Sequence, residues 1–135
     1  MADLTQTVAN VRRQTTTQRG SGTAGEPISA GMPIYRLSTD NKWYKAGNGS
    51  ATLADAGGIA LTNADVDEVL DYAISGGINV GATLTLAEIY VLSDTVGKIA
   101  PASDLGSGDF VTILGVASST SQLELNLNSS GVAKP

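Results

Sequence analysis

The chain contains neither cysteine nor histidine. Without cysteine, a disulfide, a thiolate nucleophile and a thiolate metal site are all excluded. Without histidine, the commonest general base and the commonest transition-metal ligand are missing as well. The residue inventory therefore argues against an enzyme, and we expect no cofactor and no metal.

Aromatic residues and long apolar runs are also scarce. Only 4% of residues are aromatic, and much of the 41% hydrophobic content is Ala and Val. A chain of 135 residues fits one domain of ordinary size, and so thin a core favours support from oligomerisation. The N-terminal stretch MADLTQTVANVRRQ lacks the apolar run of a secretory signal. We therefore expect synthesis in the cytoplasm and no membrane partner.

The chain has fewer basic than acidic residues. The net charge is −5 and the pI is about 4.4, which argues against non-specific binding to nucleic acid or to an anionic membrane surface. The charge is unevenly distributed, because residues 1–25 carry a net +2 and the remainder carries −7. A weakly basic N-terminus thus precedes an acidic body.

The chain divides by composition into three parts. Residues 1–26 are polar and show no sustained apolar periodicity, which predicts an extended N-terminal arm. Its apolar exceptions, Leu4, Val8 and Val11, would share one side of a short helix if a partner surface ordered the arm. A disordered tail is the alternative. Residues 27–131 form the predicted β domain, and residues 132–135 a frayed C-terminal tail.

The predicted fold is all-β, a small β-barrel or β-sandwich of short strands with one short helix. Thr39-Asp40-Asn41 has the composition of a hairpin turn. Gln122–Leu127 alternates polar and apolar residues, so this strand should bury one face. The expected strands are Met32–Ser38, Lys42–Ala46, Gly58–Leu61, Leu70–Ser75, Thr83–Leu86, Glu88–Leu92, Phe110–Ala117 and Gln122–Leu127.

Two segments have helical signals. Ser50–Ala56 predicts the short helix, with Ser50 as N-cap and Gly57 just beyond its end. Asn63–Asp71 also begins with capping residues, but we interpret it as a strand or loop.

Several motifs point to chemistry that their surroundings do not support. The run Gly20–Gly25, GSGTAG, matches a dinucleotide-binding fingerprint but lacks the preceding strand and the following helix, so we interpret it as a flexible hinge. Asp65, Asp67, Glu68 and Asp71 could supply oxygen ligands to Ca²⁺, but without EF-hand spacing a solvated charged face is preferred.

The remaining candidates are equally weak. A serine or threonine nucleophile would need Lys42, Lys45, Lys98 or Lys134 as its base, and none of these lies in a serine-lysine motif. The sequons that begin at Asn48 and Asn128 are interpreted as chance. Trp43-Tyr44 is the only adjacent aromatic pair. It fills a strand face in our preferred interpretation, and a sugar platform or a protein contact is the alternative.

Four stretches, together about residues 25–131, share one pattern of turns and strands. They are GEPISAGMPIYRL, SATLADAGGIALTNAD, ISGGINVGATLTLAEIYVLSDTVGKIAPASDLGSGDFVTILGVASS and QLELNLNSSG. Together they resemble the small capsid decoration, or cement, proteins of tailed bacteriophages. The most telling parts are Ile89–Pro101 and Gly108–Ala117. Similar segments occur in other phage virion proteins, which leaves a tail or head-fibre role open.

The resemblance implies a homotrimer on the outer surface of the virion, at threefold or quasi-threefold positions, with the major capsid protein as its partner. Such a protein clamps capsid subunits against the pressure of packed DNA. The hypothesis for contacts takes the apolar residues of the arm as anchors and its arginines as partners of capsid carboxylates. A carbohydrate-binding module that uses Trp43 and Tyr44 is the alternative. The capsid-binding candidates are Leu4, Val8, Val11, Arg12, Arg13 and Arg19.

Overall fold

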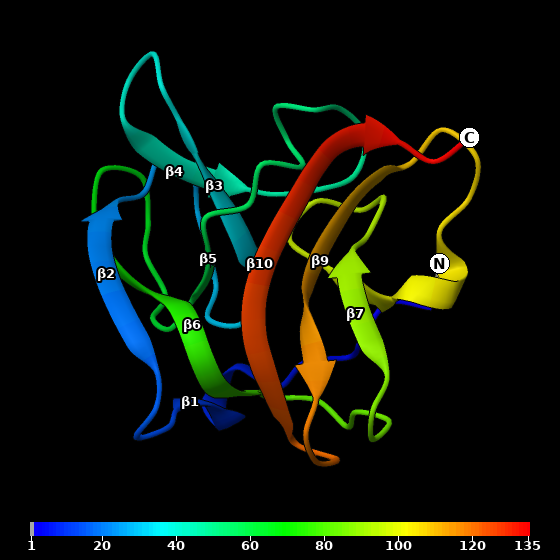
Figure 1. The fold of residues 1–135 in the computed structure, drawn as a ribbon. Coiled ribbons are helices and arrows are strands. Elements are labelled where there is room, and N and C mark those ends of the chain that lie inside the picture. Colours follow the sequence, from blue (N-terminus) through cyan, green and yellow to red (C-terminus); the bar gives the residue numbers. More distant parts are fainter. Residues whose placement is uncertain (1) are drawn as a thin grey trace.

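A computed structural model describes residues 2–135, and nearly all of its regular structure is strand (Figure 1). No α-helix occurs in these residues, and two single 3-10 turns interrupt the strands. The all-β prediction is confirmed. The elements are η1 (Val8–Asn10), β1 (Val11–Arg13), β2 (Gln18–Thr23), β3 (Pro33–Leu37), β4 (Lys42–Lys45), β5 (Gly58–Ala60), β6 (Val69–Val80), β7 (Ile89–Leu92), β8 (Ile99–Pro101), η2 (Ala102–Asp104), β9 (Phe110–Ala117) and β10 (Gln122–Ala133).

The strands form one curled antiparallel sheet that makes a half-barrel. Its order is β4-β3-β5-β6-β10-β9-β7-β8, and β1 and β2 also pair with β6. A single parallel bridge from Ala24 to Trp43 joins the end of β2 to β4. Strands β2, β6, β5, β3 and β4 are thereby linked in a ring around the smaller of two apolar clusters, which contains Ile34, Trp43 and Leu70.

Strand β6 holds the sheet together and changes partners at Gly76-Gly77. Before these glycines it pairs with β2 and β5, and after them chiefly with β1 and β10. Gly76 has φ +90°, and a Cβ there would lie 2.0 Å from the carbonyl oxygen of Thr16. Ala73 and Ile78 lie five positions apart yet both face the larger core, which regular alternation forbids. The glycine irregularity therefore inverts the faces of β6.

The larger core lies beneath strands β6 to β10. Ile78, Leu92, Ile99, Leu114 and Leu123 are fully buried in it. Alanines from the 46–56 loop also contribute. The predicted alternation of Gln122–Leu127 is confirmed by the burial of Leu123 and Leu125 between more exposed neighbours.

Several local predictions are confirmed and others are wrong. The 39–41 hairpin joins β3 to β4, with Asn41 at φ 59°, and β9 has the predicted bounds. Thr83–Leu86 forms no strand, and the three-residue strand β8 was not predicted. Both errors involve short segments whose pairing, rather than their composition, decides the conformation.

The helix expected at Ser50–Ala56 is a pair of turns instead. Ser50 does cap it, since its Oγ accepts a hydrogen bond from the Leu53 amide at 3.2 Å. The carbonyl of Ala54 does not continue a helix, because it accepts hydrogen bonds from the hydroxyls of Thr112 and Ser129. Packing on β9 and β10 thus outweighs the local helical signal.

The extended arm predicted for residues 1–26 is wrong for the described part, because residues 2–26 lie on the protein's own sheet. The Leu4 amide donates to the Ile99 carbonyl at 2.8 Å. The side-chain Nε2 of Gln6 donates to the backbone carbonyls of Gly31 and Val80 at 2.8 and 2.9 Å. Strands β1 and β2 then pair along β6. Backbone pairing needs no apolar side chains, so composition did not reveal it.

The C-terminal tail predicted at residues 132–135 is also wrong in part. Strand β10 continues to Ala133 and pairs there with Phe110. Beyond it, the amide and carbonyl of Lys134 bond to the Asp109 carbonyl and the Gly108 amide, each at 2.8 Å. The end of the chain is therefore held against the start of β9.

Candidate functional site

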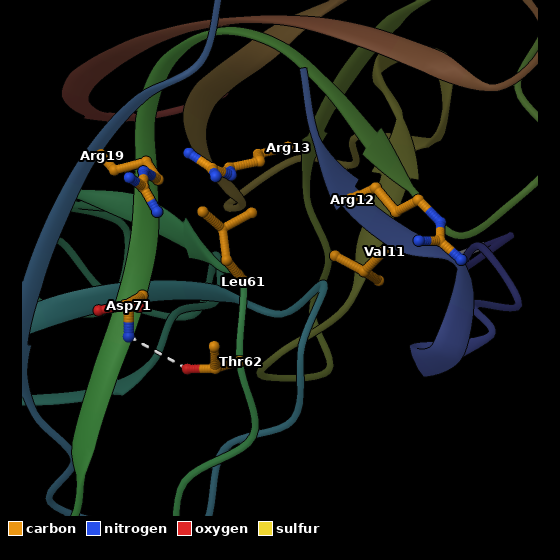
Figure 2. A pocket seen from close by; sticks show the side chains of 7 residues that line it. All are labelled: Val11, Arg12, Arg13, Arg19, Leu61, Thr62 and Asp71. Carbon is orange, nitrogen blue, oxygen red and sulfur yellow. Dashed lines mark hydrogen bonds between the residues drawn. The ribbon is translucent and has the colours of Figure 1, made fainter. Parts of the chain in front are cut away.

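An arginine-lined pocket of about 340 Å³ lies where the N-terminal segment crosses β6 (Figure 2). It brings together four of the six residues that the sequence named as capsid-binding candidates. The lining residues are Val11, Arg12, Arg13, Arg19, Leu61, Thr62 and Asp71.

Strand register explains why these side chains meet. Residues paired across antiparallel strands point to the same face of a sheet. Arg13 pairs with Ile78 and Arg19 pairs with Ala73, and both partners are buried in the larger core. The two arginines thus extend from the core-facing side of the sheet, at its rim, whereas Arg12, between Val11 and Arg13, belongs to the opposite face.

A bulge aims Arg19 at this pocket. Gln18 pairs with Ser75 but Arg19 pairs with Ala73, so Ile74 is left without a partner on β2. An unbroken ladder would pair Arg19 with Ile74 and turn its side chain to the other face. Bulges commonly re-aim a side chain in this way beside functional sites.

The pocket has a cationic side and a polar side. Figure 2 shows Arg13 and Arg19 above Leu61, with Arg12 directed away from them. On the other side, the Thr62 hydroxyl oxygen accepts a hydrogen bond from the Asp71 amide at 3.1 Å. The Leu61 amide donates to the Asp71 carbonyl at 2.8 Å, which fixes this corner of the pocket against β6.

The arginines of the pocket are not neutralised by the protein itself. Within residues 2–135 the ion pairs are Lys42 with Asp67 at 2.6 Å and Lys45 with Glu26 at 4.0 Å, and none involves an arginine. This is notable in a chain of net charge −5. Guanidinium groups present a planar fork of donors that suits an oxyanion, so the pocket can bind a carboxylate or phosphate group.

The apolar candidates of the N-terminal segment do not form one stripe. Leu4 packs against the larger core, Val8 is 41% exposed in η1, and Val11 lines the arginine pocket. The helix that would have aligned them is a single 3-10 turn, Val8–Asn10. Only Val8 is left exposed as a free apolar anchor.

The glycine run at residues 20–25 is neither a hinge nor a phosphate loop. Residues 18–23 form β2, and its glycines lie under aromatic rings. A Cβ at Gly20, Gly22 or Gly25 would lie 2.8, 2.4 or 2.3 Å from the side chains of Tyr72, Trp43 and Tyr44 respectively. The glycines are required because the rings occupy the space of their side chains.

The aromatic pair is structural. Trp43 is 7% exposed, and its ring centroid lies 4.2 Å from that of Tyr72. It thus belongs to a core face, as preferred, and offers no open platform for a sugar. Tyr44 donates its hydroxyl proton to Asp40 at 2.5 Å, and this bond raises the pKa of Tyr44 to about 12.

The acidic residues around the 65–71 loop are dispersed. Asp67 pairs with Lys42, Glu68 accepts a hydrogen bond from the Asp65 amide at 2.7 Å, and Asp71 lines the arginine pocket. No three acidic side chains in residues 2–135 are placed to share a metal ion.

Asn48, in the first sequon, is 1% exposed, and its side-chain amide donates to the Leu92 carbonyl. It is therefore closed to glycosylation.

The sequence did not predict the pocket residues Leu61, Thr62 and Asp71, and it offered Asp71 only as a cation ligand.

In the part of the chain that the structure describes, no helix has the length and apolarity to cross a bilayer. Comparison with protein-family models gave no match, and comparison with curated proteins gave none either.

Proposed function

We propose that this protein is a structural virion protein that decorates the outer surface of a tailed-phage head and stabilises it against internal DNA pressure. The proposal draws on the resemblance of residues 25–131 to capsid decoration proteins. In this role the protein binds the major capsid protein and carries out no catalysis.

The observation that carries the proposal is the unpaired positive charge of the N-terminal segment. Arg13 and Arg19 line one pocket without an ion pair among the described residues. They are held on a rigid sheet by β1 and β2. A cationic site on an otherwise acidic protein suits a specific acidic partner and disfavours non-specific binding to a polyanion.

The proposed assembly is a homotrimer. Exposed apolar side chains occur on the sheet, among them the directly paired Ile89 and Val116 of β7 and β9, which are 44% and 40% exposed. Contacts of this kind between copies would supplement the thin core. A trimer that docks through three equivalent faces gains from effective concentration, so weak single contacts give tight overall attachment.

The test is a co-sedimentation assay with heads that lack their decoration protein. The mass of the purified chain is first measured by light scattering, and the same sample is then mixed with heads and pelleted. A trimer that saturates the heads supports the proposal. A monomer that stays in the supernatant contradicts it and favours the tail-associated or head-fibre-associated alternative.

A further inference from the structure

The arginine pocket has the features of a site for one anionic group. Its cations come from two strands that are separate in sequence, β1 and β2, and its floor comes from Leu61 after β5. The bulge at Gln18-Arg19 directs the second cation to it. Arg12, the neighbouring residue, is directed away. The site therefore depends on two particular arginines rather than on the general charge of the segment.

Two like charges that share a pocket repel each other unless an anion lies between them. The one acidic side chain in the lining is Asp71, and the ion pairs of the described residues do not include it. Asp71 lowers the positive potential of the pocket without neutralising it. Such an arrangement disfavours a highly charged anion and is compatible with a singly charged one.

The apolar pocket walls and the charge of the whole protein further limit the class of ligand that the pocket can bind. Val11 and Leu61 line the pocket beside the arginines, so an acidic side chain with apolar neighbours fits better than a bare phosphate. Outside the first 25 residues the chain carries a net −7, which repels nucleic acid. A carboxylate on a protein segment is the ligand class that meets both conditions.

We propose that Arg13 and Arg19 together bind a single glutamate or aspartate side chain of a partner protein, with the Thr62 hydroxyl available as a further donor. This inference rests on the proposed function for the identity of the partner, the capsid protein, but the binding chemistry is a property of the isolated chain. Arg12 also lines the pocket, but its side chain is directed away from the other two arginines, so we do not assign it to the bound carboxylate.

The experiment is an NMR titration of the folded chain, observed at the arginine side-chain N–H signals. The probe is N-acetyl-glutamate N-methylamide, its neutral control is the glutamine analogue, and inorganic phosphate is titrated in parallel. We expect saturable shifts of Arg13 and Arg19 with the glutamate probe and none with the glutamine analogue. Shifts that follow ionic strength equally at all arginines would overturn the inference, as would tighter binding of phosphate.

Matched variants sharpen the test. Arg13→Gln and Arg19→Gln should each weaken binding of the glutamate probe about threefold to tenfold, since each removes one charge-assisted contact. Arg36→Gln removes the same charge from an exposed arginine of β3 that does not line this pocket, and it should leave binding within about twofold, as expected for a surface charge outside the contact. Asp71→Asn should tighten binding. Equal effects of Arg36→Gln and Arg13→Gln would refute the two-arginine site.

The capsid assay separates this inference from the proposed function. If the glutamate probe binds but the protein does not co-sediment with heads, the inferred carboxylate site is supported and the capsid partner is rejected. Co-sedimentation of Arg13→Gln and Arg19→Gln at wild-type affinity would retain the capsid partner and reject the pocket as its contact.

Discussion

Replacement of Gly22 by alanine tests whether the N-terminal segment is a packed strand. A Cβ at this position would lie 2.4 Å from Nε1 and 2.7 Å from Cδ1 of Trp43. The indole ring would have to move by about 1 Å to restore an ordinary contact. The indole ring has little room to move, because its centroid lies 4.2 Å from that of the Tyr72 ring and Gly57 packs against its far edge.

The expected cost follows from overpacking. Forcing one methyl group into a filled core costs about 1–3 kcal/mol. The lower flexibility of alanine in the unfolded chain returns about 0.4–1 kcal/mol. For a domain of this size each kcal/mol lost lowers Tm by about 3–5 °C. Gly22→Ala should therefore melt several degrees below the wild type in differential scanning calorimetry.

The matched control is Gly49→Ala, where the nearest atom to an added Cβ is Cδ1 of Leu53 at 3.9 Å. This variant should melt close to the wild type. Gly22→Ala should lower Tm less in a Trp43→Phe background than in the wild type, because the smaller ring leaves room for the methyl group. Equal Tm values for Gly22→Ala and Gly49→Ala would refute packing of β2 on Trp43.

Three further predictions follow from other contacts. Trp43→Ala should destabilise the fold by about 3–5 kcal/mol in urea unfolding, since it removes a buried ring, and an unchanged midpoint would contradict its place in the core. The Tyr44 phenol has an ordinary pKa of 10.0 that the bond to Asp40 raises to about 12. This bond stabilises the fold fully between pH 3.8, the ordinary pKa of Asp40, and pH 10. The effect is lost as the pH rises toward 12, and also in acid, where Asp40, whose pKa the bond lowers, becomes protonated. An absorbance titration should show Tyr44 ionising earlier in Asp40→Asn, and an identical titration would refute the bond. Deletion of residues 1–9 should lower Tm modestly because it removes the contacts of Leu4 and Gln6, whereas deletion of residues 1–19 should unfold the sheet edge. Equal Tm values for the two deletions would contradict the pairing of β1 and β2 with β6.

The expected effect of deleting residues 1–19 differs from the effect that the sequence alone predicts. An extended arm over residues 1–26, as predicted from composition, would allow residues 1–19 to be removed without harm to the β domain. The structure places Val11 and Arg13 opposite Val80 and Ile78, so their loss exposes β6. The polar composition of the segment was misleading, because it pairs through its backbone and contributes few side chains to the core.

Strands with apolar alternation were predictable, and strands defined by their partners were not. Phe110–Ala117 is rich in strand formers, and its bounds were predicted correctly. Strand β2 consists of Gln, Arg, Gly, Ser and Thr, and only the i, i+2 spacing of Gly20 and Gly22 hinted at close approach to rings. The sequence alone favours a flexible hinge there, because the aromatic partners of these glycines are distant in sequence.

The site was predictable by residue type but not by arrangement. The arginines stood out as the basic residues of an acidic chain. Their division into Arg13 and Arg19 on one face and Arg12 on the other depends on register and on the bulge at Gln18-Arg19. Leu61, Thr62 and Asp71 join them from the region of β5 and β6, and no local pattern connects these segments.

The most direct test of the proposed function is the amount of this protein that pellets with heads lacking their decoration protein, measured over a range of protein concentrations. We predict saturable binding with a fixed number of copies per head, and heads that resist heating better once decorated. Protein that remains in the supernatant at every concentration, with heads no more stable than before, would contradict a role in capsid decoration.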